Sequence, residues 1–136
     1  MKFICTFSNG NVGVAQELAA YLSRRGEGFF YLEHPLAAGR MRHSIFERHE
    51  PGKPAAARKT GWPSSRPYAH YFQAFWVTLR WILRYRRQID LFIGHSNLDC
   101  LAALAGRLGC RYKVIYVSID YTPARFHNRL LNAAYR

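Results

Sequence analysis

Apolar and polar positions follow two different periods within the first third of the chain. Residues Lys2–Ser8 (KFICTFS) form a short apolar run of β-favouring residues, which predicts a strand buried on both faces. Apolar side chains then recur at helical spacing over residues 14–25, and Gly26 is a suitable stop. Residues 29–32 predict a second strand. Strand, glycine-containing turn, helix and strand together make a βαβ unit, which requires a parallel sheet with a right-handed crossover.

The second half of the chain repeats this alternation of strands and helices. The predicted elements are a long helix at 68–88, a strand at 90–94, a helix at 98–108, a strand at 112–119 and the start of a helix at 128–136. Between the two halves the period lapses, with one short strand expected near 41–47 and a basic mobile loop over about 48–67. The pattern predicts a single α/β domain over residues 1–136, with an open, mostly parallel, Rossmann-like sheet and helices on both faces.

Composition narrows the class of protein. Hydrophobic residues make up 49% of the chain and aromatic residues 15%, which is too apolar for a disordered segment. No apolar run reaches the roughly 18 residues of a membrane-spanning helix, and the first residues lack the layout of a signal peptide. The three cysteines are widely spaced, and the histidines form no helical ligand pair, so neither a disulfide framework nor a metal site is expected. These features are typical of a cytoplasmic protein.

Positive charge is concentrated in the middle of the chain. The net charge is +12, from 20 basic and 8 acidic residues. Residues 1–39 are neutral overall, whereas residues 40–87 hold eleven basic and two acidic residues, a net +9. This distribution indicates an anionic partner such as a phosphate, a nucleic acid or a membrane surface, or else a solvated basic face.

The ends of the predicted strands carry the candidate binding residues, because open α/β sheets bind ligands beyond the carboxyl ends of their strands. After the first strand, the backbone of the glycine turn is placed to approach an anion at a helix N-terminus. After the strands at 90–94 and 112–119 stand a histidine with two capping residues and an acid that is suited to act as a base. The candidates are Gly10, Asn11, Gly13, His95, Ser96, Asn97 and Asp120. The alternative is that these residues only form turns and caps.

The helix predicted at 68–88 combines aromatic and basic side chains. At about 100° per residue, one face is expected to meet the core, namely Phe72, Phe75, Trp76, Leu79, Ile82 and Leu83. An adjacent stripe holds Arg80, Arg84 and Arg87. Trp81, Tyr85 and Val77 are expected on the side away from the core. Exposed aromatic rings beside arginines are typical of a helix that contacts anionic lipid headgroups, and the predicted membrane contacts are Arg80, Trp81, Arg84, Tyr85 and Arg87. Packing of those rings against a neighbouring domain is the alternative.

The order of these motifs resembles the N-terminal, acceptor-side domain of family 4 glycosyltransferases of the GT-B type. The distinctive stretches are DLFIGHSNL, which begins at Asp90, and KVIYVSIDYTPARF, which begins at Lys113. Family members transfer a sugar from a nucleotide-sugar donor to an acceptor, often lipid-linked, in a cleft between two Rossmann-like domains. The resemblance implies that His95 lines the acceptor cleft and that Asp120 is the acidic residue of that cleft. Many members have a histidine directly before this acid, where the present chain has Ile119.

The resemblance also implies what the chain lacks and where it works. The donor-binding C-terminal domain is expected to be absent, so sugar transfer needs that domain or a partner chain, and the present chain alone is expected to be inactive. No cofactor is implied beyond the nucleotide sugar as co-substrate, and the expected location is cytoplasmic, peripheral on the inner face of the membrane. Two other functions fit the sequence: a basic nucleic-acid-binding module and a non-catalytic nucleotide-binding α/β domain.

Overall fold

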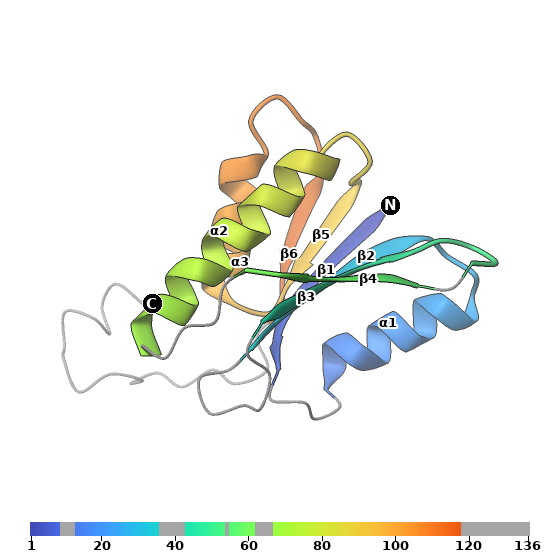
Figure 1. Ribbon diagram of the computed structural model, residues 1–136. Helices are drawn as coiled ribbons and strands as arrows, with labels where there is room; N and C mark the ends of the chain where they lie inside the picture. The colour runs from blue at the N-terminus through green and yellow to red at the C-terminus, as the bar shows by residue number, and fades with distance from the viewer. Residues whose placement is uncertain (9–12, 36–42, 54, 62–66, 118–136) are drawn as a thin grey trace.

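In the part of the chain that the structure describes, six strands form one sheet in the order β4-β3-β2-β1-β5-β6 (Figure 1). The computed structural model describes residues 1–8, 13–35, 43–53, 55–61 and 67–117. The strands are β1 (Lys2–Ser8), β2 (Phe29–Pro35), β3 (Ser44–His49), β4 (Ala56–Thr60), β5 (Leu91–Gly94) and β6 (Lys113–Tyr116). The helices are α1 (Val14–Arg24), α2 (Pro67–Tyr85) and α3 (Asn97–Gly106).

The sheet is mixed but mostly parallel, which confirms the α/β class expected from the sequence. Strand β1 pairs in parallel with β2 on one side and with β5 on the other, and β5 pairs in parallel with β6. The two remaining pairs, β2 with β3 and β3 with β4, are antiparallel. The first strand is central and adjoins the strand near residue 90, and Lys2 is in register with both Phe29 and Leu91.

The central strands β1, β2 and β5 bury both of their faces because helices cover this part of the sheet on both sides (Figure 1). In β1 the side chain of Ile4 belongs to a cluster with Ala15 and Leu22 of α1. Its neighbours Phe3 and Cys5 point to the opposite face, where α2 and α3 lie side by side and contribute a larger core. This alternation follows from the two-residue period of a strand, and it explains why β1 is apolar throughout.

The loop expected over about 48–67 contains a strand, so that prediction is wrong for residues 56–60. Strand β4 pairs with β3, from Ser44 opposite Thr60 to Arg48 opposite Ala56. Its side chains are almost all exposed, so no apolar period marks it in the sequence. Exposed basic side chains are what an edge strand needs in order to avoid pairing with another chain.

The face of α2 that meets the core also differs from the prediction. Val77, Trp81 and Ile82 are buried, whereas Phe72, Trp76 and Leu83 are exposed. The helix is rotated because Trp81 stacks on Phe46 of β3, with ring centroids 3.7 Å apart and planes within 2°. Periodicity alone could not anticipate this contact, since both faces of α2 carry large apolar residues. The expected helix at 128–136 lies outside the described residues.

Candidate functional site

The carboxyl edge of β1 and β5 is the point where the chain changes direction in the sheet. From β1 the chain passes through α1 to β2, and from β5 it passes through α3 to β6 on the opposite side of β1. In open α/β sheets, ligands bind at the edge where helices leave neighbouring parallel strands in opposite directions. The first residues after these strands therefore define the candidate site.

The N-terminus of α1 forms one side of this edge. Gly13 is the N-cap residue, and its N–H donates a hydrogen bond to Gln16 Oε1 over 3.0 Å. A Cβ atom added at Gly13 would approach only Gln16 Oε1, at 3.2 Å. Val14, the first residue of the helix, is exposed. Among the described residues apart from its chain neighbours, only the flexible end of Gln16 would have to move for an anion to reach the Gly13 amide.

The N-terminus of α3 forms the other side of the edge. Ser96 is the N-cap residue, and its hydroxyl accepts a hydrogen bond from the Asp99 N–H over 3.1 Å. Asn97 is the first residue of the helix and is exposed. The capping expected for this pair is thus made by Ser96, and Asn97 leaves its amide in solvent.

His95 is held between these two helices by the backbone of β1. Its N–H and its Nδ1 both lie 3.1 Å from the carbonyl oxygen of Cys5. A carbonyl only accepts, so Nδ1 carries the proton in the neutral ring and Nε2 presents a lone pair. Within the described part of the chain, Nε2 is buried and has no hydrogen-bond partner. The His95 ring is half-buried, so Nε2 can accept a hydrogen bond from a ligand hydroxyl once the groups that now cover this atom move aside.

Three of the predicted site residues cannot be compared with the fold. Gly10, Asn11 and Asp120 lie outside the described residues. Gly13 and His95 follow neighbouring strands of the sheet, as expected, and their convergence with Asp120 stays a prediction.

A cluster of buried polar side chains below this edge was missed by the sequence prediction. It lies on the α2 and α3 side of the sheet and consists of Cys5, His34, Ser44, Thr78 and Asp99, all buried. His34 bridges two hydroxyls, with Nδ1 2.7 Å from Ser44 Oγ and Nε2 2.8 Å from Thr78 Oγ1. Cys5 Sγ lies 3.5 Å from Thr78 Oγ1, and Asp99 Oδ1 lies 3.8 Å from His34 Nε2. The five residues come from five different elements, so no spacing in the sequence links them.

Burial sets the protonation of this cluster. Desolvation raises the pKa of Asp99 to about 7 and lowers the pKa of His34 to about 3. It also raises the pKa of the Cys5 thiol well above its ordinary value, and the nearby Asp99 carboxylate adds to that rise. With no cation present, the cluster thus favours neutral forms of all three groups.

The outer face of α2 carries basic and aromatic side chains, although not the aromatic ones expected. Trp81 is buried and Tyr85 is half-buried against Phe30 and Phe46, so the prediction that these two rings point outward is wrong. Arg84 lies over both rings, 5.8 Å and 5.7 Å from their centroids, and covers them from solvent.

Other large side chains take the outer positions of this helix. We use the name α2 outer face for Phe72, Trp76, Arg80 and Leu83, which recur every three or four residues of α2, together with Arg87 in the turn that follows; all five are exposed. Phe72 is 66% exposed and its ring meets the edge of Trp76, which is 49% exposed. The stripe of Arg80, Arg84 and Arg87 predicted from the sequence is exposed in the structure.

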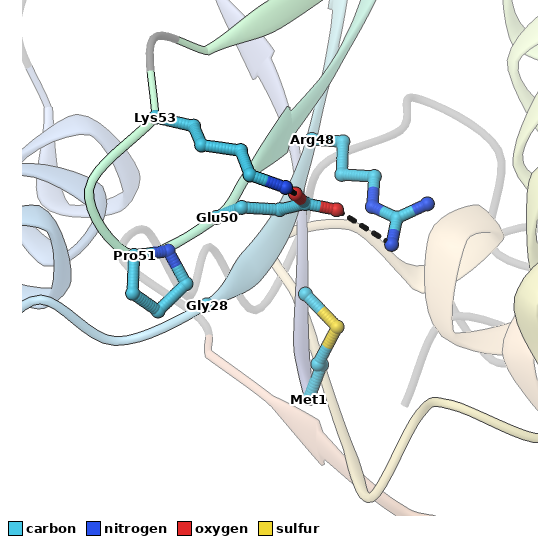
Figure 2. Close-up of a pocket in the computed structure, with 6 residues that line it drawn as sticks. All are labelled: Met1, Gly28, Arg48, Glu50, Pro51 and Lys53. Carbon is cyan, nitrogen blue, oxygen red and sulfur yellow. Dashed lines mark hydrogen bonds and ion pairs between the residues drawn. The ribbon is translucent and has the colours of Figure 1, made fainter.

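A hollow of about 390 Å³ lies at the opposite, amino edge of the sheet (Figure 2). Its lining residues are Met1, Gly28, Arg48, Glu50, Pro51 and Lys53. Glu50 lies between the two basic side chains, 2.7 Å from Arg48 Nη2 and 2.6 Å from Lys53 Nζ (Figure 2). Both cations already share one carboxylate, so the hollow offers little free charge to an anionic ligand.

The fold is that of an α/β domain, and its switch point between β1 and β5 is the candidate binding edge. Among the residues that the structure describes, no helix is both long and apolar enough to cross a bilayer. Comparison with models of protein families, with curated proteins and with solved structures finds no match to this chain.

Proposed function

We propose that this chain is the acceptor-side domain of a GT-B glycosyltransferase, which moves a sugar from a nucleotide-sugar donor to an acceptor at an anionic membrane surface. The observation that carries the proposal is the placement of His95 at the switch-point edge, with Nδ1 bound to the Cys5 carbonyl and Nε2 without a partner among the described residues. An imidazole in this state accepts the proton of an acceptor hydroxyl as the hydroxyl attacks the donor sugar.

The rest of the edge supports binding of a polar ligand. The amide of Gly13 and the first turn of α1 supply backbone donors and the positive end of a helix dipole. Asn97 adds an exposed side-chain amide on the other side of the crevice. The donor nucleotide is held by a second domain or a partner chain, and on this proposal the present chain does not turn over alone.

The α2 outer face is the proposed membrane contact. Phe72 and Trp76 supply amphipathic or apolar rings of the kind found at membrane interfaces, and Arg80 and Arg87 on the same face attract anionic headgroups. In this proposal Phe72 and Trp76, which lie one helical turn apart, take the membrane-contacting role that the sequence predicted for Trp81 and Tyr85.

The test is sugar transfer by this chain combined with its donor-binding domain, assayed with a panel of nucleotide sugars and lipid-linked acceptors. We expect His95→Gln to lower turnover by roughly two orders of magnitude or more, with a small change in melting temperature. His49→Gln is the matched control, because His49 lies on β3 opposite Phe29 at the amino edge of the sheet. Full turnover in His95→Gln, or turnover by the present chain alone, would contradict the proposal. A salt-sensitive shift of nucleic acid by the chain, without transfer activity, would favour the nucleic-acid-binding alternative.

A further inference from the structure

We propose that Cys5, His34 and Asp99 form a buried zinc-binding site beneath the switch-point edge. Their ligand atoms, one sulfur, one nitrogen and one carboxylate oxygen, all lie within 4.8 Å of one another. In a tetrahedral zinc site, bonds of about 2.0–2.3 Å place ligand atoms roughly 3.3–3.8 Å apart. The His34 Nε2 to Asp99 Oδ1 distance is 3.8 Å, whereas a nitrogen and an oxygen ligand lie about 3.3 Å apart, so side-chain movements of about 1 Å or less close the site.

Asp99 supplies an independent sign that something is bound. Both oxygens of its carboxylate are buried, and neither makes a hydrogen bond of ordinary geometry among the described residues, although the Ser96 hydroxyl and the Cys5 thiol lie nearby. A buried carboxylate without partners is costly and rare in folded proteins. Its side chain lies beside His34 and Cys5, so a cation at the centre of the three would satisfy it.

The charges of the three ligands match a divalent cation. A thiolate and a carboxylate carry one negative charge each, and His34 binds as a neutral imidazole. A divalent ion therefore gives a neutral cluster, which suits a site where all three side chains are shielded from solvent. Sulfur and imidazole ligands favour zinc over magnesium or calcium, which prefer oxygen.

The surroundings of His34 also fit a metal ligand. A histidine that binds metal through one ring nitrogen usually donates the other N–H to an acceptor, and His34 Nδ1 lies 2.7 Å from Ser44 Oγ. Thr78 Oγ1 lies 2.8 Å from His34 Nε2 and 3.5 Å from Cys5 Sγ, so an ion bound by these two ligands would take the place of both hydrogen bonds. A catalytic role for the thiol is excluded, because Cys5 is fully buried and no substrate reaches it.

The proposed ion would join β1, β2 and α3, the elements that carry the three ligands. It would fix the first turn of α3 against the sheet, directly behind the backbone that orients His95. Its role is thus structural, and it stands or falls independently of sugar transfer.

The experiment measures metal content and stability of the full chain. Protein purified without chelators and dialysed against zinc should hold one zinc per chain by mass spectrometry, and Co²⁺ in its place should give the absorption of a thiolate–cobalt bond. Zinc at a thousand times its Kd should raise the melting temperature of the chelator-treated protein by roughly 10–15 °C.

Variants separate this site from adventitious binding. Asp99→Asn, which keeps the shape of the side chain, should weaken zinc binding at least tenfold, and Cys5→Ala should abolish the cobalt–thiolate absorption. Cys110→Ala is the control, because Cys110 belongs to the end of the core beyond α3 and lies outside the cluster. Wild-type protein that stays folded and metal-free in excess zinc would overturn the proposal without any variant. Equal zinc binding by wild type, Asp99→Asn and Cys5→Ala would overturn it as well.

Discussion

The two tryptophans of α2 should respond to truncation in opposite ways, because one is buried and the other faces outward. Trp81 is 7% exposed and stacks on Phe46, whereas Trp76 contacts its helical neighbours Phe72 and Phe75 and is half exposed. Trp81→Ala opens a cavity between α2 and the sheet. Trp76→Ala removes a ring from the surface.

The size of the Trp81 effect can be worked from its surroundings. Truncating a buried tryptophan to alanine costs about 3–5 kcal/mol in general. The buried Nε1–H of Trp81 has no partner among the described residues, and its removal returns part of that cost, since an unpaired buried donor costs about 1–3 kcal/mol. We therefore expect a net loss of about 3 kcal/mol, or roughly 10 °C in melting temperature. Trp81→Phe, which keeps an aromatic ring and removes the unpaired N–H, should lose less than about 1.5 kcal/mol.

Trp76→Ala should cost less than about 1 kcal/mol, since surface substitutions seldom cost more. Chemical denaturation gives the stability of each variant, and partition onto vesicles that contain anionic lipid gives its membrane affinity. Trp76→Ala should weaken partition onto vesicles and leave stability nearly unchanged. Trp81→Phe should leave partition unchanged, because the Trp81 ring is buried. If Trp76→Ala destabilises the protein as much as Trp81→Ala does, the assignment of the two faces of α2 is wrong.

Three further perturbations test other parts of the structure. In chelator-treated protein, the raised pKa of Asp99 makes the fold more stable as pH falls from 8 to 5, and the lowered pKa of His34 makes it less stable, each by about 2–3 kcal/mol. The free energy of unfolding of wild type, measured by chemical denaturation, should therefore change little between pH 8 and pH 5. That of Asp99→Asn should fall by about 2 kcal/mol over the same range. An unfolding free energy of Asp99→Asn that does not change with pH would contradict the effect of His34. Gly94→Ala places a Cβ atom 2.7 Å from Cys100 Sγ and should lower the free energy of unfolding by about 1–3 kcal/mol. A variant as stable as wild type would mean that α3 moves freely away from β5. Replacing Arg80, Arg84 and Arg87 together with Gln should weaken binding to anionic vesicles by roughly two orders of magnitude at low salt, at about 1 kcal/mol for each arginine. An unchanged partition would mean that these arginines form an ordinary solvated face.

The sequence predicts the parallel part of the sheet well because burial on both faces leaves a clear signal there. The bounds of β1 are as expected, and the switch between β1 and β5 follows from the order of strands and helices. Strand β4 could not be found in this way, because an exposed edge strand carries no apolar period. The orientation of α2 was also out of reach, since it depends on Phe46, which lies on an antiparallel strand far from α2 in the sequence.

The residues of the candidate site differ in the same way in how far the sequence predicts them. His95 and Ser96 directly follow a strand, so their position at the edge can be read from local order. The polar cluster around His34 forms only where five elements meet in three dimensions, and two of its members, Cys5 and Asp99, are more than 90 residues apart along the chain. The one local signal was His34, which follows Glu33 at the end of the apolar start of β2.

Cys5 links the edge site to the buried cluster, and its two functions should be separable. The backbone carbonyl of Cys5 accepts the hydrogen bonds that orient His95, while the Cys5 side chain points toward Thr78 of α2. Cys5→Ala removes the thiol and keeps the carbonyl, so we expect loss of bound zinc with no change in the Nδ1–H tautomer of His95. Nitrogen chemical shifts of the histidine rings report that tautomer directly, and His49 in the same spectrum is the internal control. If the tautomer of His95 changes in Cys5→Ala at unchanged overall fold, then the side chain of Cys5, and not its carbonyl, positions the imidazole.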